Sequence, residues 1–321
     1  MKNLLLTGSS GWLGRFLAPR LQGDGFRVIG LDLAPGEFTT VVGTVADRPL
    51  IDNVFAEYGV DAVIHCGALH KPDIARYSRQ AFVDTNVAGT LNLLEAAVTA
   101  GHDRFVFTST TSLMISKEVR SGSKGGATRA FWMDETFGPI QPRNIYGVTK
   151  YAAEQLCQLF ADQHGLDIAI LRTARFFPED DDTLAHPSGP NLKANEFLHR
   201  RLSVIDAADA HRAALKKIQG RGCRTYLLSA PTPFAREDCE ALVRDAKSVI
   251  AKYFPDASEL YAKSGWVLPN AIERVYDATR SHQELGFRAE VDFSLILETL
   301  AADAPLPFHH DPHYVPTKEQ T

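Results

Sequence analysis

The 321-residue chain is poor in cysteine and has no long apolar run. Its cysteines, Cys66, Cys157, Cys223 and Cys239, are widely spaced and form no C-x-x-C pair, so neither a disulfide framework nor a zinc knuckle is indicated. Reduced thiols are typical of a cytoplasmic protein, which is the location we expect. No run approaches the roughly 20 apolar residues of a membrane span, and the apolar residues 4–6 are too few for a signal peptide.

Concentrated charge is also missing. The net charge is -5, and no run of Lys and Arg marks a nucleic-acid-binding stripe. His309, His310 and His313 lie near Asp311, but no rigid element frames them, so we predict a mobile tail and no metal site. We therefore expect a small-molecule substrate, and no nucleic acid or membrane as partner.

Short apolar runs alternate with helical patterns through the first half of the chain. Buried strands are predicted at 4–7, 27–31, 62–65, 105–108 and 168–171, and helices at 13–22, 50–58, 81–100 and 146–164. A helix at 206–217 and a strand at 225–229 follow later. This alternation is typical of right-handed βαβ units, and it predicts an α/β fold with a Rossmann-type doubly wound parallel sheet.

The pattern loosens after residue 175. We predict a dinucleotide-binding domain over 1–175, with parts of 200–230 returning to it. A smaller, discontinuous, C-terminal substrate-binding lobe is expected mainly over 176–308, followed by a tail at 309–321. The polar segment 121–126 is expected to be a flexible loop or lid, and the acidic run 180–182 a solvated loop.

Three glycines follow the first predicted strand and open the first predicted helix. Gly8 allows a tight turn, Gly11 lets backbone N–H groups approach a pyrophosphate, and Gly14 lets helix and strand pack closely. Asp32 ends the second strand, about 20 residues further on, where its carboxylate can bind a ribose diol and repel a 2′-phosphate. No arginine follows Asp32 directly, so the spacing favours NAD over NADP.

Tyr146 and Lys150 are four residues apart, which places them on one face of a helix. A nearby ammonium stabilises a phenolate, so we expect Lys150 to lower the pKa of Tyr146. Such a phenol can exchange a proton with a substrate hydroxyl while hydride moves to or from nicotinamide. Thr110 follows a strand at its carboxyl end, and its hydroxyl is placed to hold the reacting oxygen.

In these features the chain resembles an extended short-chain dehydrogenase/reductase of the NAD-dependent epimerase/dehydratase family. The resemblance covers residues 2 to about 300 and rests on Thr7-Gly8-x-x-Gly11-x-x-Gly14, Asp32, Val63-Ile64-His65-Cys66-Gly67-Ala68, Asn86-Val87-x-Gly89-Thr90-x-Asn92, Phe105-Val106-Phe107-Thr108-Ser109-Thr110, Tyr146-x-x-x-Lys150, Val204-Ile205-Asp206-Ala207-Ala208-Asp209-Ala210-His211 and Ala278-x-Arg280-x-x-x-Glu284-Leu285-Gly286-Phe287. It implies that Tyr146 is the acid/base, that Lys150 also binds the nicotinamide ribose, and that Thr110 is the catalytic hydroxyl.

The resemblance also implies binding residues. Expected cofactor contacts are Gly8, Ser10, Gly11, Trp12, Leu13, Gly14, Asp32, Thr44, Val45, Cys66, Gly67, Ala68, Asn86, Thr108, Tyr146 and Lys150. Thr110, Thr111 and Arg175 are the expected substrate contacts, and Arg175 is placed to pair either with a substrate carboxylate or with a nearby acid. Helices 81–100 and 146–164 would pair across a two-fold axis in a homodimer, although Leu156 and Leu159 fit an ordinary core equally well.

Departures from the family pattern reduce the number of reactions that the chain is expected to catalyse. Sugar dehydratases carry Asp-Glu after the catalytic Thr, whereas Thr111 and Ser112 stand here, which disfavours 4,6-dehydration. Thr173-Ala174-Arg175 replaces the Tyr-Phe-Asn run of nucleotide-sugar epimerases, and residues 176–179 are more like the uronate dehydrogenase branch. We expect an NAD-dependent oxidoreductase or epimerase acting on a sugar, nucleotide-sugar or sugar-acid hydroxyl. The alternatives are a uronate-type dehydrogenase that releases NADH and a catalytically silent dinucleotide-binding regulator.

Overall fold

The computed structural model describes residues 2–101, 104–121, 128–180, 187 and 189–316. The expected lid at 121–126 therefore lies outside the described residues except for its first position. Of the acidic run 180–182, only Asp180 is among the described residues.

The larger part of the molecule is built on a seven-stranded sheet in which all neighbouring strands are parallel. The strand order is β3 (Val41–Val42), β2 (Arg27–Asp32), β1 (Asn3–Thr7), β4 (Ala62–His65), β5 (Arg104–Thr110), β7 (Asp167–Thr173) and β8 (Cys223–Leu228). The order reverses between β1 and β4, the switch point of a doubly wound sheet. This confirms the predicted fold class.

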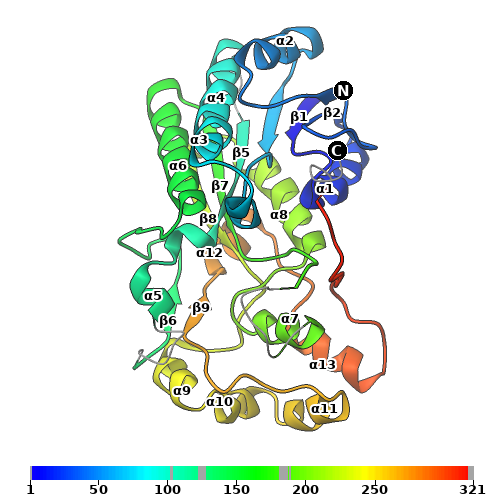
Figure 1. Ribbon diagram of the computed structural model, residues 1–321, viewed down its shortest axis with the longest axis vertical. Coiled ribbons are helices and arrows are strands. Elements are labelled where there is room, and N and C mark those ends of the chain that lie inside the picture. The colour runs from blue at the N-terminus through cyan, green and yellow to red at the C-terminus, as the bar shows by residue number, and fades with distance from the viewer. Residues whose placement is uncertain (1, 102–103, 122–127, 181–186, 188, 317–321) are drawn as a thin grey trace.

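Helices cover both faces of this sheet (Figure 1). One face packs against α1 (Trp12–Gly23), α8 (Val204–Lys217) and α12 (Thr279–Leu285), and the other against α2 (Arg48–Tyr58), α4 (Gly89–Thr99) and α6 (Ile145–His164). The helix expected at 81–100 is divided into α3 (Arg79–Val83), a π turn (Asp84–Ala88) and α4. The π turn carries Asn86, whose amide bonds the backbone of Leu69.

A smaller lobe lies below the carboxyl ends of the strands (Figure 1). It contains α7 (Gly189–Phe197), α9 (Cys239–Arg244), α10 (Ala246–Tyr253), α11 (Ala257–Lys263) and α13 (Phe293–Ala301). A parallel two-stranded sheet pairs β6 (Phe131–Met133) with β9 (Arg274–Tyr276), and α5 (Lys117–Ser121) precedes β6. Phe197, Tyr261 and Phe293 form part of a separate core there. The lobe thus takes β6 from a stretch that we assigned to the dinucleotide-binding domain.

The C-terminal segment differs from the mobile tail that we expected. His309 and Tyr314 pack against the ring of Trp12 at the start of α1, and His310 bonds Lys193 of α7. The pattern of the sequence does not reveal these contacts, because both partners are distant along the chain. Residues 317–321 lie outside the described part.

All four cysteines are free thiols. None of the helices in the described ranges is long and apolar enough to cross a membrane.

Candidate active site

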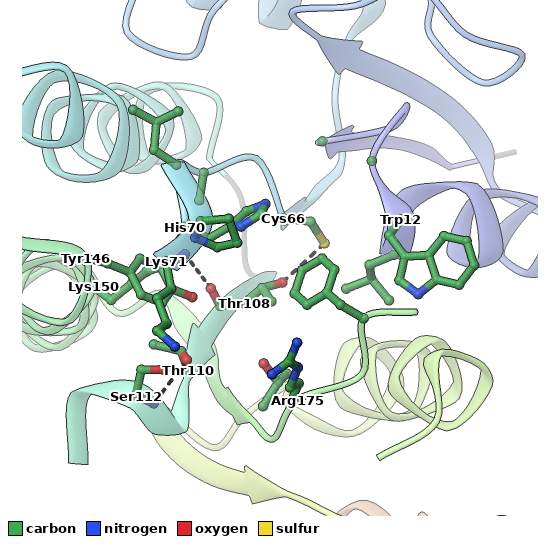
Figure 2. Close-up of a pocket in the computed structure, with 18 of the residues that line it drawn as sticks. Trp12, Cys66, His70, Lys71, Thr108, Thr110, Ser112, Tyr146, Lys150 and Arg175 are labelled. Atoms are coloured by element: carbon green, nitrogen blue, oxygen red, sulfur yellow. Dashed lines mark hydrogen bonds between the residues drawn. The ribbon is translucent and has the colours of Figure 1, made fainter. Parts of the chain in front are cut away.

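A cavity of about 820 Å³ opens at the carboxyl ends of the strands, between the sheet and the smaller lobe. Figure 2 shows Trp12 on one side of it and Tyr146 with Lys150 on the other. It brings together most of the predicted site residues: Gly8, Gly11, Trp12, Leu13, Asp32, Thr44, Val45, Cys66, Gly67, Ala68, Thr108, Thr110, Thr111, Tyr146, Lys150 and Arg175. Ser10, Gly14 and Asn86 are not in the lining, and each supports it from behind.

The glycine turn between β1 and α1 is shaped for a dinucleotide. Gly8 has φ 76°, and a Cβ there would lie 2.8 Å from the backbone nitrogen of Gly67. A Cβ on Gly14 would lie 2.2 Å from the carbonyl oxygen of Gly8, so only glycine lets α1 pack this closely. Gly11 is the N-cap of α1 and has no side chain to bond the first-turn N–H groups. This end of α1 therefore fits a pyrophosphate.

Asp32 is held rigidly at the end of β2. Its Oδ2 accepts a hydrogen bond from the Ser10 N–H at 3.0 Å, and its Oδ1 accepts one from the Ala34 N–H at 3.1 Å. The Ser10 hydroxyl donates to the Ala34 carbonyl oxygen at 2.8 Å, so it braces the loop and does not face the cavity. A fixed carboxylate at this strand end fits the ribose diol of NAD.

The segment after β4 forms the opposite wall of the cofactor end. Asn86 accepts from the Leu69 N–H and donates to the Leu69 carbonyl oxygen, both at 2.9 Å, and this fixes the backbone that follows Cys66. The Thr108 hydroxyl donates to the Cys66 sulfur at 3.2 Å. His65 bonds the hydroxyls of Thr7 and Thr90, so it is a structural residue of the strand end.

The catalytic candidates come from α6 and β5. Asn144 caps α6 by accepting from the Gly147 N–H at 2.9 Å, which fixes where the helix begins and hence where Tyr146 points. Lys150 donates from Nζ to the Thr108 carbonyl oxygen at 2.7 Å. Figure 2 shows Tyr146 and Lys150 extending from α6 toward Thr108 and Thr110.

Burial sets the charge states of this pair. It raises the pKa of Tyr146 to about 12, although a hydrogen bond with Thr110 acts in the opposite direction. Burial also lowers the pKa of Lys150 to about 8. The net pKa of Tyr146 is thus raised, because desolvation of the phenolate is its largest cause. The lowering of this pKa by Lys150 remains a prediction.

The substrate end has a basic wall, of which the sequence indicated Arg200, next to the family's diphosphate-binding position at His199, but not Arg274. Arg200 and Arg274 line the cavity, and the buried Nε atom of each has no hydrogen-bond partner among the described residues. Arg200 also pairs with Glu196 at 2.9 Å. Burial would raise the pKa of Glu196, but Arg200 and Arg201 outweigh it and lower this pKa to about 2. The family motifs did not mark Arg274, which the pairing of β9 with β6 brings to the site.

The remaining predicted substrate contacts already have partners. The Thr111 hydroxyl donates to the Thr173 carbonyl oxygen at 3.3 Å, and the Arg175 guanidinium donates to the Asp180 carbonyl oxygen at 3.2 Å. His70, Lys71 and Tyr314 also line the cavity and were missed in the sequence. Among the described residues, no group of three or more His, Cys, Asp or Glu side chains is arranged to hold a metal ion.

A glycine turn, a carboxylate at the end of β2 and a Tyr–Lys pair at one cavity are the combination expected of an enzyme of the extended short-chain dehydrogenase/reductase type. The profile of the NAD-dependent epimerase/dehydratase family matches residues 4–221. The chain belongs to this family, is an NAD-dependent enzyme of it, and uses NAD as its cofactor.

Two relatives match most of the chain. A UDP-glucose 4-epimerase of Rhizobium meliloti (strain 1021) is 32% identical, with 92% of this chain and 95% of that protein covered. A dTDP-glucose 4,6-dehydratase of Streptomyces antibioticus is 28% identical, with 91% of this chain and 89% of that protein covered.

Solved structures share the fold. The UDP-glucose 4-epimerase of Thermotoga maritima, solved with UDP-glucose, superposes with a TM-score of 0.64 at 20% identity and covers 94% of this chain and 99% of its own. A mutated uronate dehydrogenase superposes with a TM-score of 0.61 at 20% identity and covers 99% of this chain and 92% of its own.

Proposed function

We propose that this enzyme moves hydride between NAD and a hydroxyl-bearing carbon of a sugar, nucleotide-sugar or sugar-acid substrate. One observation carries the proposal. The Tyr146, Lys150 and Thr110 side chains line the same cavity as the glycine turn and Asp32. A substrate hydroxyl held by Tyr146 and Thr110 would lie where the nicotinamide end of a dinucleotide reaches.

Each residue has a distinct task in this scheme. NAD supplies the hydride acceptor or donor when bound. Tyr146 exchanges the hydroxyl proton with the substrate, and Thr110 donates a hydrogen bond that holds the reacting oxygen. Lys150, with a pKa of about 8, is mostly protonated at neutral pH and supplies the positive charge that favours a phenolate one helical turn away.

The basic wall indicates that the substrate carries an anionic group. Arg200 and Arg274 present buried N–H groups without partners, and burying such donors unpaired is costly. A diphosphate or a carboxylate would satisfy them, and bidentate pairing with guanidinium groups suits both. Nucleotide sugars and sugar acids therefore fit the cavity better than neutral sugars.

The first test is Tyr146→Phe with a panel of nucleotide sugars and sugar acids, followed by NADH absorbance and by chromatographic detection of epimers. We expect turnover to fall by about 10²- to 10⁴-fold because the proton-transferring hydroxyl is lost, while NAD binding is retained. Tyr151→Phe on the same helix is the matched control, since Tyr151 is not part of the cavity lining. A Tyr146→Phe enzyme as active as the wild type contradicts the proposal.

A uronate-type dehydrogenase is the second candidate. Phe176 and Phe177 stack with ring centroids 4.8 Å apart, and Phe177 packs on His70, so aromatic rings narrow the substrate end beside Arg175. A small sugar acid suits a narrowed end better than a nucleotide does. Near-stoichiometric NAD or NADH in freshly purified protein would favour the epimerase, whereas cofactor-free protein that reduces added NAD with a sugar acid would favour the dehydrogenase. Turnover of no panel member, with NAD bound, would favour the silent regulator.

We also propose that the enzyme is a cytoplasmic homodimer. Its free cysteines support a reducing compartment. Val148 and Leu159 of α6 are 48% and 45% exposed, and eleven residues bring a helix back to the same face after about three turns. These apolar side chains support pairing of α6 with the α6 of a second copy.

A further inference from the structure

The last described residues cross from the smaller lobe to the dinucleotide-binding part of the molecule. Phe308 is buried in the core of the smaller lobe, 5.3 Å from Phe197 between ring centroids. From there the chain runs to the start of α1, as the red segment of Figure 1 shows. Residues 309–316 are called the C-terminal strap below.

Aromatic contacts hold both the first part and the last part of the strap on α1. The ring of Trp12 meets His309 at 5.4 Å and Tyr314 at 5.1 Å, both edge to face. His309 also contacts Phe16 at 5.0 Å. The Arg15 guanidinium lies 5.3 Å from the Trp12 ring and 5.8 Å from the Tyr314 ring. Trp12 is thus surrounded by strap residues and by its own helix.

Polar contacts of the residues between His309 and Tyr314 hold the strap on the smaller lobe. His310 Nδ1 lies 2.6 Å from the Lys193 ammonium, and the Asp311 N–H donates to the Pro178 carbonyl oxygen at 3.0 Å. Trp12 itself donates from Nε1 to the Phe176 carbonyl oxygen at 3.2 Å. The strap therefore joins the two parts of the molecule beside the cavity.

The strap is also part of the cavity wall. Tyr314 and Pro316 line the same cavity as Gly11 and Trp12. Gly11 and Trp12 begin the helix whose N-terminus fits the pyrophosphate. We propose that the C-terminal strap closes the dinucleotide site over the pyrophosphate end and slows release of the bound cofactor, with His309 and Tyr314 as the retaining residues.

The test is NADH release from the full-length protein, measured by stopped-flow fluorescence after mixing with excess NAD. An aromatic contact changes an equilibrium by roughly 2- to 12-fold, so loss of both rings in His309→Ala/Tyr314→Ala should speed release by about 10-fold or more. His313→Ala is the matched control, because it removes an imidazole from the same segment at an exposed position. We expect His313→Ala to release NADH at the wild-type rate.

Release from the double variant within two-fold of the wild-type rate, with thermal unfolding unchanged, overturns the proposal. If the double variant does not fold, the single variants His309→Ala and Tyr314→Ala decide in the same way. The readout needs no substrate, so failure of this inference is distinguishable from failure of the proposed reaction.

Discussion

Tyr146 and Lys150 lie one helical turn apart, and burial shifts their pKa values in opposite directions. Burial raises the pKa of Tyr146 to about 12 and lowers the pKa of Lys150 to about 8. Both shifts favour neutral groups, as expected where the surroundings are poorly solvated. Tyr146 is therefore protonated at neutral pH and can donate a proton, and it can accept one only where positive charge stabilises its phenolate.

The glycines of the turn should respond differently to the same substitution. Gly14→Ala places a methyl group 2.2 Å from the Gly8 oxygen and 2.8 Å from Ser9 backbone carbon, so it should cost about 1–3 kcal/mol of unfolding free energy or more. Gly11→Ala meets only the Gly8 oxygen at 3.2 Å, so it should fold but bind NAD more weakly. Thermal unfolding and NAD titration of both variants check this.

Gly23→Ala is the control, since nothing lies within 4 Å of a Cβ at that helical position. It should leave both stability and NAD affinity intact. A Gly14→Ala protein as stable as the Gly23→Ala protein would show that the turn can relax.

At the scale of elements, a buried ion pair fixes α6 against the sheet. Arg172 of β7 contacts Glu154 of α6 at 2.8 Å, with 8% and 3% of the two side chains exposed. The Ser109 hydroxyl of β5 donates to the same carboxylate at 2.6 Å. Glu154 is one helical turn beyond Lys150 on α6. The ion pair therefore fixes the position of Lys150 and Tyr146 along the helix axis relative to Thr108 and Thr110 of β5.

Breaking this ion pair on one side should be costly. Arg172→Met leaves the Glu154 carboxylate buried without its counter-charge, and we expect a loss of about 3–5 kcal/mol in chemical denaturation. The double variant Glu154→Met/Arg172→Met should recover much of that loss, because no charge is left unpaired. Arg244→Met, which breaks an exposed pair with Glu240, should change stability little. A small effect of Arg172→Met alone would mean that water reaches Glu154.

At the scale of the whole molecule, the site is assembled from both lobes. The sheet and its flanking helices supply the cofactor end and, on α6, the Tyr–Lys pair, whereas Arg200 and Arg274 come from segments that pack with the smaller lobe. The C-terminal strap connects the lobes on the side of α1. A movement of one lobe relative to the other would therefore shift Arg200 and Arg274 against the substrate and, at the same time, shift the C-terminal strap against the dinucleotide site.

The proposed dimer makes a prediction at the same scale. Leu159→Glu places a charge in the centre of the exposed apolar face of α6 and should shift the protein to monomers in sedimentation velocity experiments. Val267→Glu is the matched control, since Val267 is 43% exposed and its backbone bonds Asn191 and Asn195 of α7 in the smaller lobe. A wild-type protein that sediments as a monomer contradicts the dimer.

Local sequence patterns predicted most strands of the large sheet. They did not predict features that depend on contacts between residues far apart in the chain. The strands β1, β2, β4, β5 and β7 were predicted because their apolar runs are continuous, as burial on both faces of a sheet requires. The two-residue β3 and the short strands β6 and β9 were missed, since two or three residues carry no periodicity. The strap was mistaken for a tail because its aromatic partners lie on α1.

The fold class and the family could be predicted from the sequence alone, and both are confirmed. The glycine turn, Asp32 and the set of Tyr146, Lys150 and Thr110 were also predicted from it, and the structure brings them to one cavity. Those features depend on short spacings that a turn or one helix converts directly into geometry. The effect of burial on the pKa values of Tyr146 and Lys150, the basic wall of Arg200 and Arg274, and the path of the C-terminal strap could be seen only in the folded molecule. Burial, and contacts between residues far apart in the chain, arise when the two lobes pack together.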